Sequence, residues 1–235
     1  MRILAVESSA KCCSTAVVED GRIVSEFYTD AGLTHSQTLM QMVDAVLSCA
    51  TLSLASIDAI AVARGPGSFT GIRIGIAAVK GLAHSSDIKC YGVSTLEAMA
   101  YSFLGEDCTV CAVMDARRDQ VYTALFDIRG NRVIRLSADS AVSVVDLKEI
   151  LSDISQKSQI ILVGDGADVY YETLVEGNPY VVKALKPLRY QRAYGVAMAV
   201  FSSMLINECS SYETLQPVYL RAPQAERELK RVREI

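Results

Sequence analysis

The 235-residue sequence has no tryptophan and only two histidines. It also has no apolar run of about 18 residues, the length that a membrane-spanning helix needs, so we expect no such helix. The N-terminus turns acidic at Glu7, too early for a secretory signal peptide. The seven cysteines are an odd number without framework spacing, which predicts reduced thiols and a cytoplasmic protein.

The sequence also lacks a marked excess of charge of either sign. Lysine and arginine number 23 and aspartate and glutamate 27, so the net charge of −4 gives no argument for nucleic-acid binding by the chain as a whole. Hydrophobic residues make up 51% of the sequence, which excludes a disordered chain. The length is enough for one large domain or two small ones.

Several catalytic signatures are missing. No Gly-x-Ser-x-Gly motif occurs, and neither His35 nor His84 has a second histidine nearby, which argues against a serine hydrolase. Leu39 stands four residues after His35, where a helical metal site would need its second ligand, so we predict no metal site. Cys108 and Cys111 lie three residues apart on a predicted strand and would point to opposite faces, so they would not share a metal.

The sequence does contain a glycine-rich stretch, Gly-Pro-Gly-Ser-Phe-Thr-Gly-Ile-Arg-Ile-Gly, from Gly65 to Gly75. It follows an apolar, strand-like run and opens a predicted helix that extends to about His84. Backbone amides at such a helix start can bind phosphate. The Gly-Lys-Ser/Thr ending of a P-loop is absent, because Gly71 is followed by Ile72. The stretch therefore indicates either an anion site or the start of a closely packed helix.

The predicted elements follow the same order in the two halves of the chain. Each half reads β-β-β-α-β-α-β-α, with an acidic residue at the end of its first strand, Glu7 or Asp115, and glycines after its fourth. This duplication predicts an α/β fold of two related lobes, each with a mixed five-stranded sheet and helices, and a cleft between them. We expect the first lobe over residues 1–105, the second over 106–208, and a C-terminal tail over 209–235 that returns to the first lobe.

The predicted helix over residues 69–84 is a candidate for a partner or dimer interface. It is apolar nearly all round, so its own lobe is not expected to cover it. Small residues in one stripe would let another helix approach closely. The candidate interface residues on this helix are Phe69, Gly71, Ile72, Gly75, Ile76, Ala78 and Val79, and the family resemblance described below adds Leu39, Met42, Val43 and Val46 on the helix over residues 35–50.

A second set of residues is a candidate nucleotide or anion site in the cleft. Ligands of α/β sheets bind at the carboxyl ends of strands, where a carboxylate can hold magnesium through water. The alternative is that each acid only accepts hydrogen bonds from a nearby loop. The set comprises Glu7, Ser8, Ser9, Gly67, Ser68, Asp115, Gly164 and Gly166. We predict no intrinsic cofactor, with ATP and magnesium as the alternative.

A stretch without acidic residues extends from Gly177 to Asn207. Tyrosines lie between its basic residues, which are Lys183, Lys186, Arg189 and Arg192. Basic residues interleaved with aromatic ones can contact RNA, whereas the usual role of such a stretch is a solvated face. Both interpretations stay open.

The glycine-rich stretch resembles that of the TsaB (YeaZ) family, whose members help to make threonylcarbamoyladenosine on tRNA. The resemblance continues nearly from end to end, in Ile3-Leu4-Ala5-Val6-Glu7-Ser8-Ser9, His35-Ser36-Gln37, Gly92-Val93-Ser94-Thr95-Leu96, Asp115-Ala116-Arg117-Arg118 and Pro217-Val218-Tyr219-Leu220-Arg221. It implies the actin/Hsp70/sugar-kinase superfold, in agreement with the duplicated halves. Most members of the family have aspartate where this chain has Glu7.

The resemblance also implies a non-catalytic role. The catalytic relative of the family, TsaD, carries a His-x-x-x-His metal site on the helix that corresponds to residues 35–50, and here Leu39 replaces the second histidine. Family members pair with TsaD through first-lobe helices, work with the ATPase TsaE, form homodimers when alone and reach tRNA through the complex. The resemblance thus implies a scaffold and activating subunit without catalytic residues. Its complex would transfer a threonylcarbamoyl group to the adenosine beside the anticodon. The alternative is an independent ATPase or phosphotransferase that uses the cleft.

Overall fold

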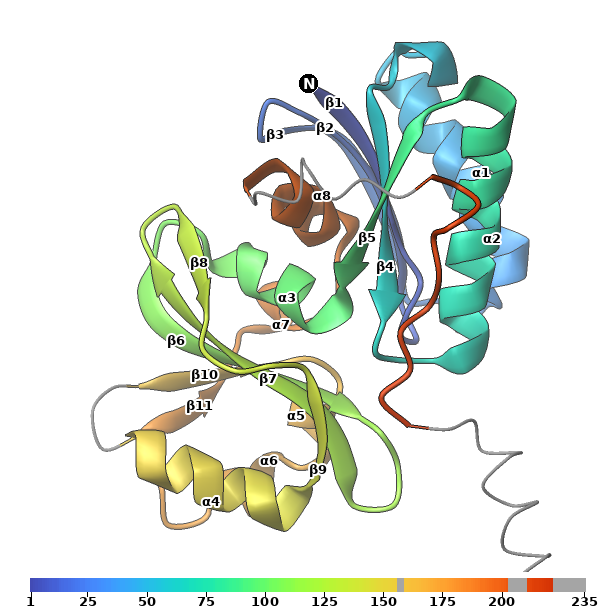
Figure 1. The fold of residues 1–235 in the computed structure, drawn as a ribbon. Helices are drawn as coiled ribbons and strands as arrows, with labels where there is room; N and C mark the ends of the chain where they lie inside the picture. Colours follow the sequence, from blue (N-terminus) through green and yellow to red (C-terminus); the bar gives the residue numbers. More distant parts are fainter. Residues whose placement is uncertain (156–158, 203–210, 222–235) are drawn as a thin grey trace, which may run out of the picture.

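The computed structural model describes residues 1–155, 159–202 and 211–221, which form two layered lobes (Figure 1). The first sheet has the strand order β3-β2-β1-β4-β5. It is mixed, as predicted, because β1 pairs antiparallel with β2 and parallel with β4. Its strands are β1 (Arg2–Glu7), β2 (Cys13–Glu19), β3 (Arg22–Thr29), β4 (Ala59–Gly65) and β5 (Lys89–Ser94).

The second sheet has the same plan with one strand more than predicted. Its order is β11-β10-β6-β7-β8, and β9 also pairs with β7. β8 lies against residues 126–129 of β7 and β9 against residues 120–123, so two short strands share one edge. The strands are β6 (Asp107–Asp115), β7 (Gln120–Arg129), β8 (Arg132–Arg135), β9 (Ser140–Ser143), β10 (Ile160–Val163) and β11 (Val181–Lys183).

Local sequence signals set the turns and helix ends of the first lobe. Asp20 and Gly21 have φ values of 49° and 79°, the left-handed conformation that the tight turn between β2 and β3 requires. The helix α2 (Phe69–Ser86) begins where Ser68 Oγ accepts a hydrogen bond from the backbone N–H of Gly71 at 3.2 Å. It ends at Asp87, which is left-handed with φ 51°.

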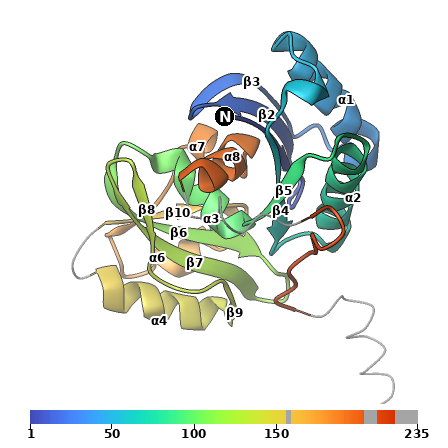
Figure 2. The same ribbon diagram turned by 45° about the horizontal axis from the view of Figure 1, so that its top comes forward.

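Helices cover both faces of each sheet (Figures 1 and 2). The helices α1 (His35–Cys49) and α2 cover the outer face of the first sheet. The helices α4 (Val144–Ser155), α5 (Gly166–Val169) and α6 (Tyr171–Val175) cover the outer face of the second. Between the sheets lie α3 (Thr95–Ala100) and α8 (Ala193–Ser202). The remaining elements are α7 (Lys186–Arg189) and the 3-10 turns Leu54–Ser56 and Tyr101–Phe103.

Each of the two inner helices packs against the sheet formed by the other half of the chain. Val196 and Val200 of α8 pack against Ile3 of the first sheet, although α8 falls within residues 106–208. Leu96 of α3 packs against the second sheet, although α3 belongs to the first half. In packing terms, α8 is therefore part of the first lobe. None of the described helices is both long and apolar enough to cross a membrane.

Residues 211–221, which we call the strap, lie on the first lobe and run beside α2 in Figures 1 and 2. Leu215 is 1% exposed and packs in the core of that lobe. The backbone N–H of Val218 donates to the carbonyl oxygen of Arg64 at 2.7 Å. Residues 209–210 and 222–235 of the predicted tail lie outside the described residues, as do residues 203–206 of the predicted last helix.

The contact between α3 and α8 depends on Gly195. A Cβ added there would overlap the carbonyl oxygen of Ala98. We expect Gly195→Ala to lower the free energy of unfolding by about 1–3 kcal/mol, the usual cost of overpacking. Urea unfolding measures the change.

The matched control for Gly195→Ala is Gly81→Ala in α2. A Cβ at Gly81 meets nothing within 4 Å, so this variant should gain up to about 1 kcal/mol in helix propensity. A Gly195→Ala protein as stable as the wild type would show that the two helices tolerate a wider spacing.

Candidate functional site

A cavity of about 420 Å³ opens between the lobes, at the carboxyl ends of β1 and β6. The loop after β1 and the start of α2 form one wall, the turn between β6 and β7 forms another, and the strap contributes two residues. The lining residues are Ser9, Ala10, Lys11, Gly67, Ser68, Phe69, Thr70, Met114, Asp115, Ala116, Arg117, Tyr122, Asp165, Tyr219 and Arg221.

Four of the predicted anion-site residues line this cavity: Ser9, Gly67, Ser68 and Asp115. The Oγ of Ser9 is buried and has no hydrogen-bond partner among the described residues. The backbone N–H of Ser68 donates to the carbonyl oxygen of Ser9 at 2.6 Å, so the loop after β1 is fixed to the glycine-rich stretch. The first turn of α2 therefore stands at the cavity wall beside an unpaired hydroxyl group.

Glu7 and Ser8 are fully buried and are not among the lining residues. Oε1 of Glu7 accepts the backbone N–H of Ser9 at 2.6 Å, whereas Oε2 has no hydrogen-bond partner in the described structure. Burial raises the pKa of Glu7 to about 7, partly opposed by the hydrogen bond from the backbone N–H of Ser9. The hydroxyl of Ser8 donates to the carbonyl oxygen of Gly71 at 2.9 Å. Both residues thus support the loop that forms the wall.

Gly164 and Gly166 do not line the cavity, so their place beside a nucleotide stays a prediction. A Cβ at Gly164 would overlap the carbonyl oxygen of Val113, and one at Gly166 would lie 2.9 Å from the carbonyl carbon of Met114. In the structure, the two glycines let the loop after β10 approach β6. Asp165 between them does line the cavity, and burial raises its pKa.

Most of the predicted interface residues face the core of the first lobe, which corrects that prediction. The buried ones are Leu39, Met42, Val43, Val46, Gly71, Ile72, Gly75, Ile76 and Val79. A Cβ at Gly71 would overlap the carbonyl oxygen of Ser8, and one at Gly75 would overlap its Oγ, so both glycines serve packing inside the chain. Phe69 and Ala78 are half-buried.

The outward side of α2 consists of other residues, which we call the outer face: Ile74, Ala77, Ala78 and Gly81. Ala77 and Gly81 are exposed, and Ile74 and Ala78 are half-buried. All four are small or apolar. On the adjacent helix α1, Met40 is also exposed. The outward side of α2 also carries the exposed Thr70, Arg73 and His84, so the helix is less apolar all round than predicted, and its exposed small residues differ from those expected.

The basic stretch between Gly177 and Asn207 is largely neutralised within the chain. Arg189 and Lys183 form ion pairs with Asp168 at 2.6 Å and 3.4 Å, and Arg192 pairs with Glu26. Burial opposes ionisation of Asp168, but the Tyr190 hydroxyl and the Arg189 guanidinium outweigh it and lower the pKa of this carboxyl. These pairs favour a structural role over RNA contact.

Sequence reasoning missed the cations of the cavity, Lys11, Arg117 and Arg221. Lys11 and Arg117 follow the first strand of each half, so the duplication itself was a signal that could have identified them. Arg221 arrives from the strap, and no local pattern places it there.

His35 and Leu39 do not form a metal site. The Nε2 of His35 lies 2.8 Å from the carbonyl oxygen of Ala10, and Leu39 is 1% exposed in the core. Among the described residues, no group of three histidine, cysteine, aspartate or glutamate side chains could hold a metal ion.

Comparison with known proteins shows which proteins this chain is similar to. A family model described as TsaD, tRNA N6-adenosine threonylcarbamoyltransferase, matches residues 29–229. The chain is 33% identical over 153 residues to the tRNA threonylcarbamoyladenosine biosynthesis protein TsaB of Bacillus subtilis (strain 168), covering 65% of this chain and 67% of that protein. It is 40% identical over 126 residues to the protein of the same name from Escherichia coli (strain K12), covering 53% of this chain and 54% of that protein.

Solved structures agree over more of the chain. YeaZ from Pseudomonas aeruginosa is 28% identical with a TM-score of 0.77, covering 93% of this chain and 99% of that chain. The ethanolamine utilization protein EutJ from Carboxydothermus hydrogenoformans, 13% identical with a TM-score of 0.50, shares the fold alone. Two duplicated mixed sheets with a cavity between them define a protein of the actin/Hsp70/sugar-kinase superfold. Within that class, the chain belongs to the TsaB (YeaZ) family.

The buried carboxyl of Glu7 predicts a pH-dependent stability. Its folded pKa of about 7 lies above the ordinary 4.5, so this group makes the fold progressively less stable as pH rises from 4.5 to 7. The full cost at higher pH is about 3 kcal/mol. Glu7→Gln removes the charge, so its stability relative to the wild type should rise between pH 5 and pH 8.

Thermal unfolding of both proteins at each pH measures this difference. The exposed Glu149→Gln is the matched control and should change stability by less than about 0.5 kcal/mol at both pH values. A constant difference between Glu7→Gln and the wild type would mean that Glu7 ionises as it does in water.

Proposed function

We propose that this chain is a non-catalytic subunit that scaffolds and activates a tRNA-modifying enzyme complex in the cytoplasm. The complex transfers a threonylcarbamoyl group to the adenosine beside the anticodon. Support comes from the names of the relatives, which are tRNA threonylcarbamoyladenosine biosynthesis proteins, and of the matching family model, which is a threonylcarbamoyltransferase. The proposed catalytic partner is a TsaD homologue, joined by the ATPase TsaE, and tRNA is reached through the complex.

The observation that carries the proposal is Gly81 in the outer face of α2. Glycine in a helix interior costs about 1 kcal/mol relative to alanine. A Cβ at Gly81 would meet nothing within 4 Å, so packing among the described residues gives no reason for glycine. A helix of another subunit that crosses α2 at this point gives one, because glycine lets two backbones approach closely. The neighbouring Ala77 and Ala78 keep the rest of the surface low and apolar.

The chemistry of α1 supports a non-catalytic role. Its first turn holds His35, whose Nε2 lies 2.8 Å from a backbone carbonyl oxygen. The residue one turn later, Leu39, has a hydrocarbon side chain in the core and cannot bind a metal. In the absence of the TsaD homologue, a second copy of this chain would cover the same outer face.

Gly81→Glu is the variant that tests the outer face. A carboxylate in the middle of a buried helix contact would be desolvated without a partner, so the variant should no longer co-purify with the TsaD homologue. The melting temperature of the isolated chain should stay within a few degrees of the wild type, because the position is exposed. Gly75→Glu is unsuitable as a test, since a side chain there overlaps Ser8 and would damage the fold.

The functional readout is reconstituted tRNA modification. The mixture contains the TsaD homologue, TsaE, an adenylate-forming TsaC enzyme, ATP, threonine, bicarbonate and tRNA, with this chain as wild type, as Gly81→Glu, as Gly81→Ala or omitted. We expect full modification with the wild type, a reduced yield with the control Gly81→Ala, and no modification with Gly81→Glu or without this chain. Full modification without this chain would refute the proposed function. Full activity of Gly81→Glu would refute only the interface.

A second candidate function is an independent nucleotide-binding ATPase or phosphotransferase. The observation in its favour is the buried, unpaired Oγ of Ser9 at the cavity wall, beside the first turn of α2. Lys11 and Arg221 also line this cavity and would attract the phosphates of a nucleotide. Magnesium would accompany the nucleotide at Asp115.

Titration calorimetry of the isolated chain with ATP and magnesium tests this second candidate. It predicts a dissociation constant below about 1 mM, equivalent to about 4 kcal/mol, and weaker binding by Ser9→Ala. The exposed Ser48→Ala is the matched control and should bind as the wild type does. Absence of heat at millimolar nucleotide would eliminate the candidate.

A further inference from the structure

The strap is attached along one side of α2, from the end of the helix to its beginning. The Nζ of Lys80 donates to the carbonyl oxygen of Glu213 at 3.3 Å, and the rings of His84 and Tyr212 meet edge to face with centroids 5.0 Å apart. Near the start of the helix, the rings of Phe69 and Tyr219 lie 4.9 Å apart. The strap therefore follows α2 as a second layer beside its outer face.

Arg73 joins the strap to the exposed side of α2. Its guanidinium carbon lies 3.8 Å from the centroid of the Phe69 ring, and its Nε donates to the hydroxyl of Tyr219 at 2.9 Å. Arg73 is itself exposed, and it precedes Ile74 and Ala77 of the outer face by one and four residues. A subunit seated on the outer face would lie next to Arg73 and would order its contacts with the strap.

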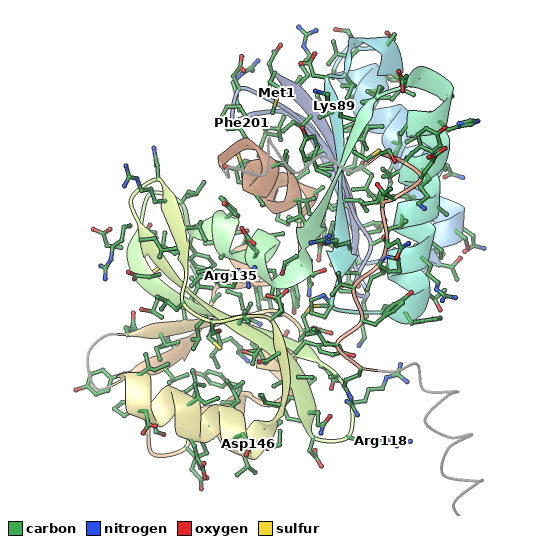
Figure 3. The ribbon with its side chains drawn as sticks, viewed as in Figure 1. Met1, Lys89, Arg118, Arg135, Asp146 and Phe201 are labelled. Carbon is green, nitrogen blue, oxygen red and sulfur yellow. The ribbon has the colours of Figure 1, made fainter. Side chains whose placement is uncertain are left out.

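The other end of the strap reaches the second lobe. The Nη1 of Arg221 donates to the carbonyl oxygens of Ala116 and Arg117 at 2.7 Å and 3.3 Å. Those two residues line the cavity and belong to the turn between β6 and β7. Three consecutive residues of that turn, from Arg117 to Asp119, have φ between 54° and 62°, a conformation that side-chain-bearing residues rarely adopt. Figure 3 labels Arg118 in this turn.

We propose that the strap couples the two sites: a partner bound to the outer face of α2 and closure of the second lobe over the cavity stabilise each other. The inference rests on the proposed function, and it adds that Tyr219 and Arg221 are the positioning residues. In the closed arrangement, Arg221 holds the carbonyl groups of the turn, and in the open arrangement these two hydrogen bonds are lost. A partner that orders Arg73 and Tyr219 favours the closed arrangement.

Coupling of this kind is reciprocal, because the two equilibria share one element. Loss of the contacts between the strap and the second lobe must therefore lower the affinity of the partner for α2, although Arg221 is not part of the outer face. The lobes are also connected by the contact between the inner helices α3 and α8 and by the start of α2, where Gly67 lies beside Met114. Among the described residues, the strap lies beside the outer face and also reaches the turn of the second lobe, so we assign the coupling to the strap.

The first experiment is hydrogen exchange of the full isolated chain, read at the peptide over residues 114–122. Arg221→Ala should lose protection in this peptide, since the carbonyl oxygens of Ala116 and Arg117 no longer accept hydrogen bonds from the strap. The matched control is Arg22→Ala, an arginine exposed in the hairpin between β2 and β3. Unchanged exchange in Arg221→Ala would show that the strap does not hold the turn, which overturns the proposal.

The second experiment measures the affinity of the same proteins for the TsaD homologue by calorimetry. Arg221→Ala should bind about fivefold more weakly than the wild type, at the lower end of measured couplings. Tyr219→Phe keeps the ring beside Phe69 but removes the oxygen that Arg73 contacts, so it should weaken binding in the same direction. Addition of the partner to the wild type should increase protection of residues 114–122.

The outcomes separate this inference from the function on which it rests. If the wild type binds the partner and Arg221→Ala binds equally well, the coupling is refuted and the proposed function stands. If the wild type does not bind the partner at all, both the coupling and the proposed function are refuted. If Arg221→Ala binds more weakly and Arg22→Ala binds as the wild type does, the strap is the coupling element.

Discussion

The fold depends on the pair of helices that lies between the two sheets. Each sheet has a second apolar face that must be kept from water, and α8 covers that of the first sheet while α3 covers that of the second. The close approach of Gly195 to the backbone of Ala98 sets the distance between these helices. The lobes on either side also form the walls of the cavity, so packing far from the charged residues determines how widely the cavity opens.

Three different sides of the helix α2 contribute to the core of the first lobe, to the cavity wall and to the outer face. Its inward side, with Ile72 and Val79, packs in the core of the first lobe. Its first turn stands at the wall of the cavity, beside the unpaired hydroxyl of Ser9. Its outer face is small and apolar and is bordered by the strap. An event on any one side therefore reaches the other two through a rigid element rather than through a flexible loop.

The sequence was sufficient to predict those parts of the fold and the site that are determined by local interactions. Apolar, strand-like runs and their duplicated order predicted both sheets, and the rule about strand ends predicted that Ser9 and Asp115 lie at the cavity. It was insufficient where the interaction is distant. Nothing near Arg221 indicates that it reaches the second lobe, and nothing in α8 shows which sheet it covers. Nor can a helix that is apolar on every side reveal its inward face, which is why Gly71 and Gly75 were assigned outward and Gly81 was overlooked.

The chain must be almost completely synthesised before its first sheet is covered on both sides. The strands of that sheet end at residue 94, but the helix that covers their inner face spans Ala193–Ser202. A ribosome-bound chain that has completed the sheet therefore presents Ile3, Ala5 and Val93 to water until nearly the whole sequence has emerged. The first half by itself therefore exposes an uncovered apolar sheet face, which makes it a poor candidate for expression as a separate fragment.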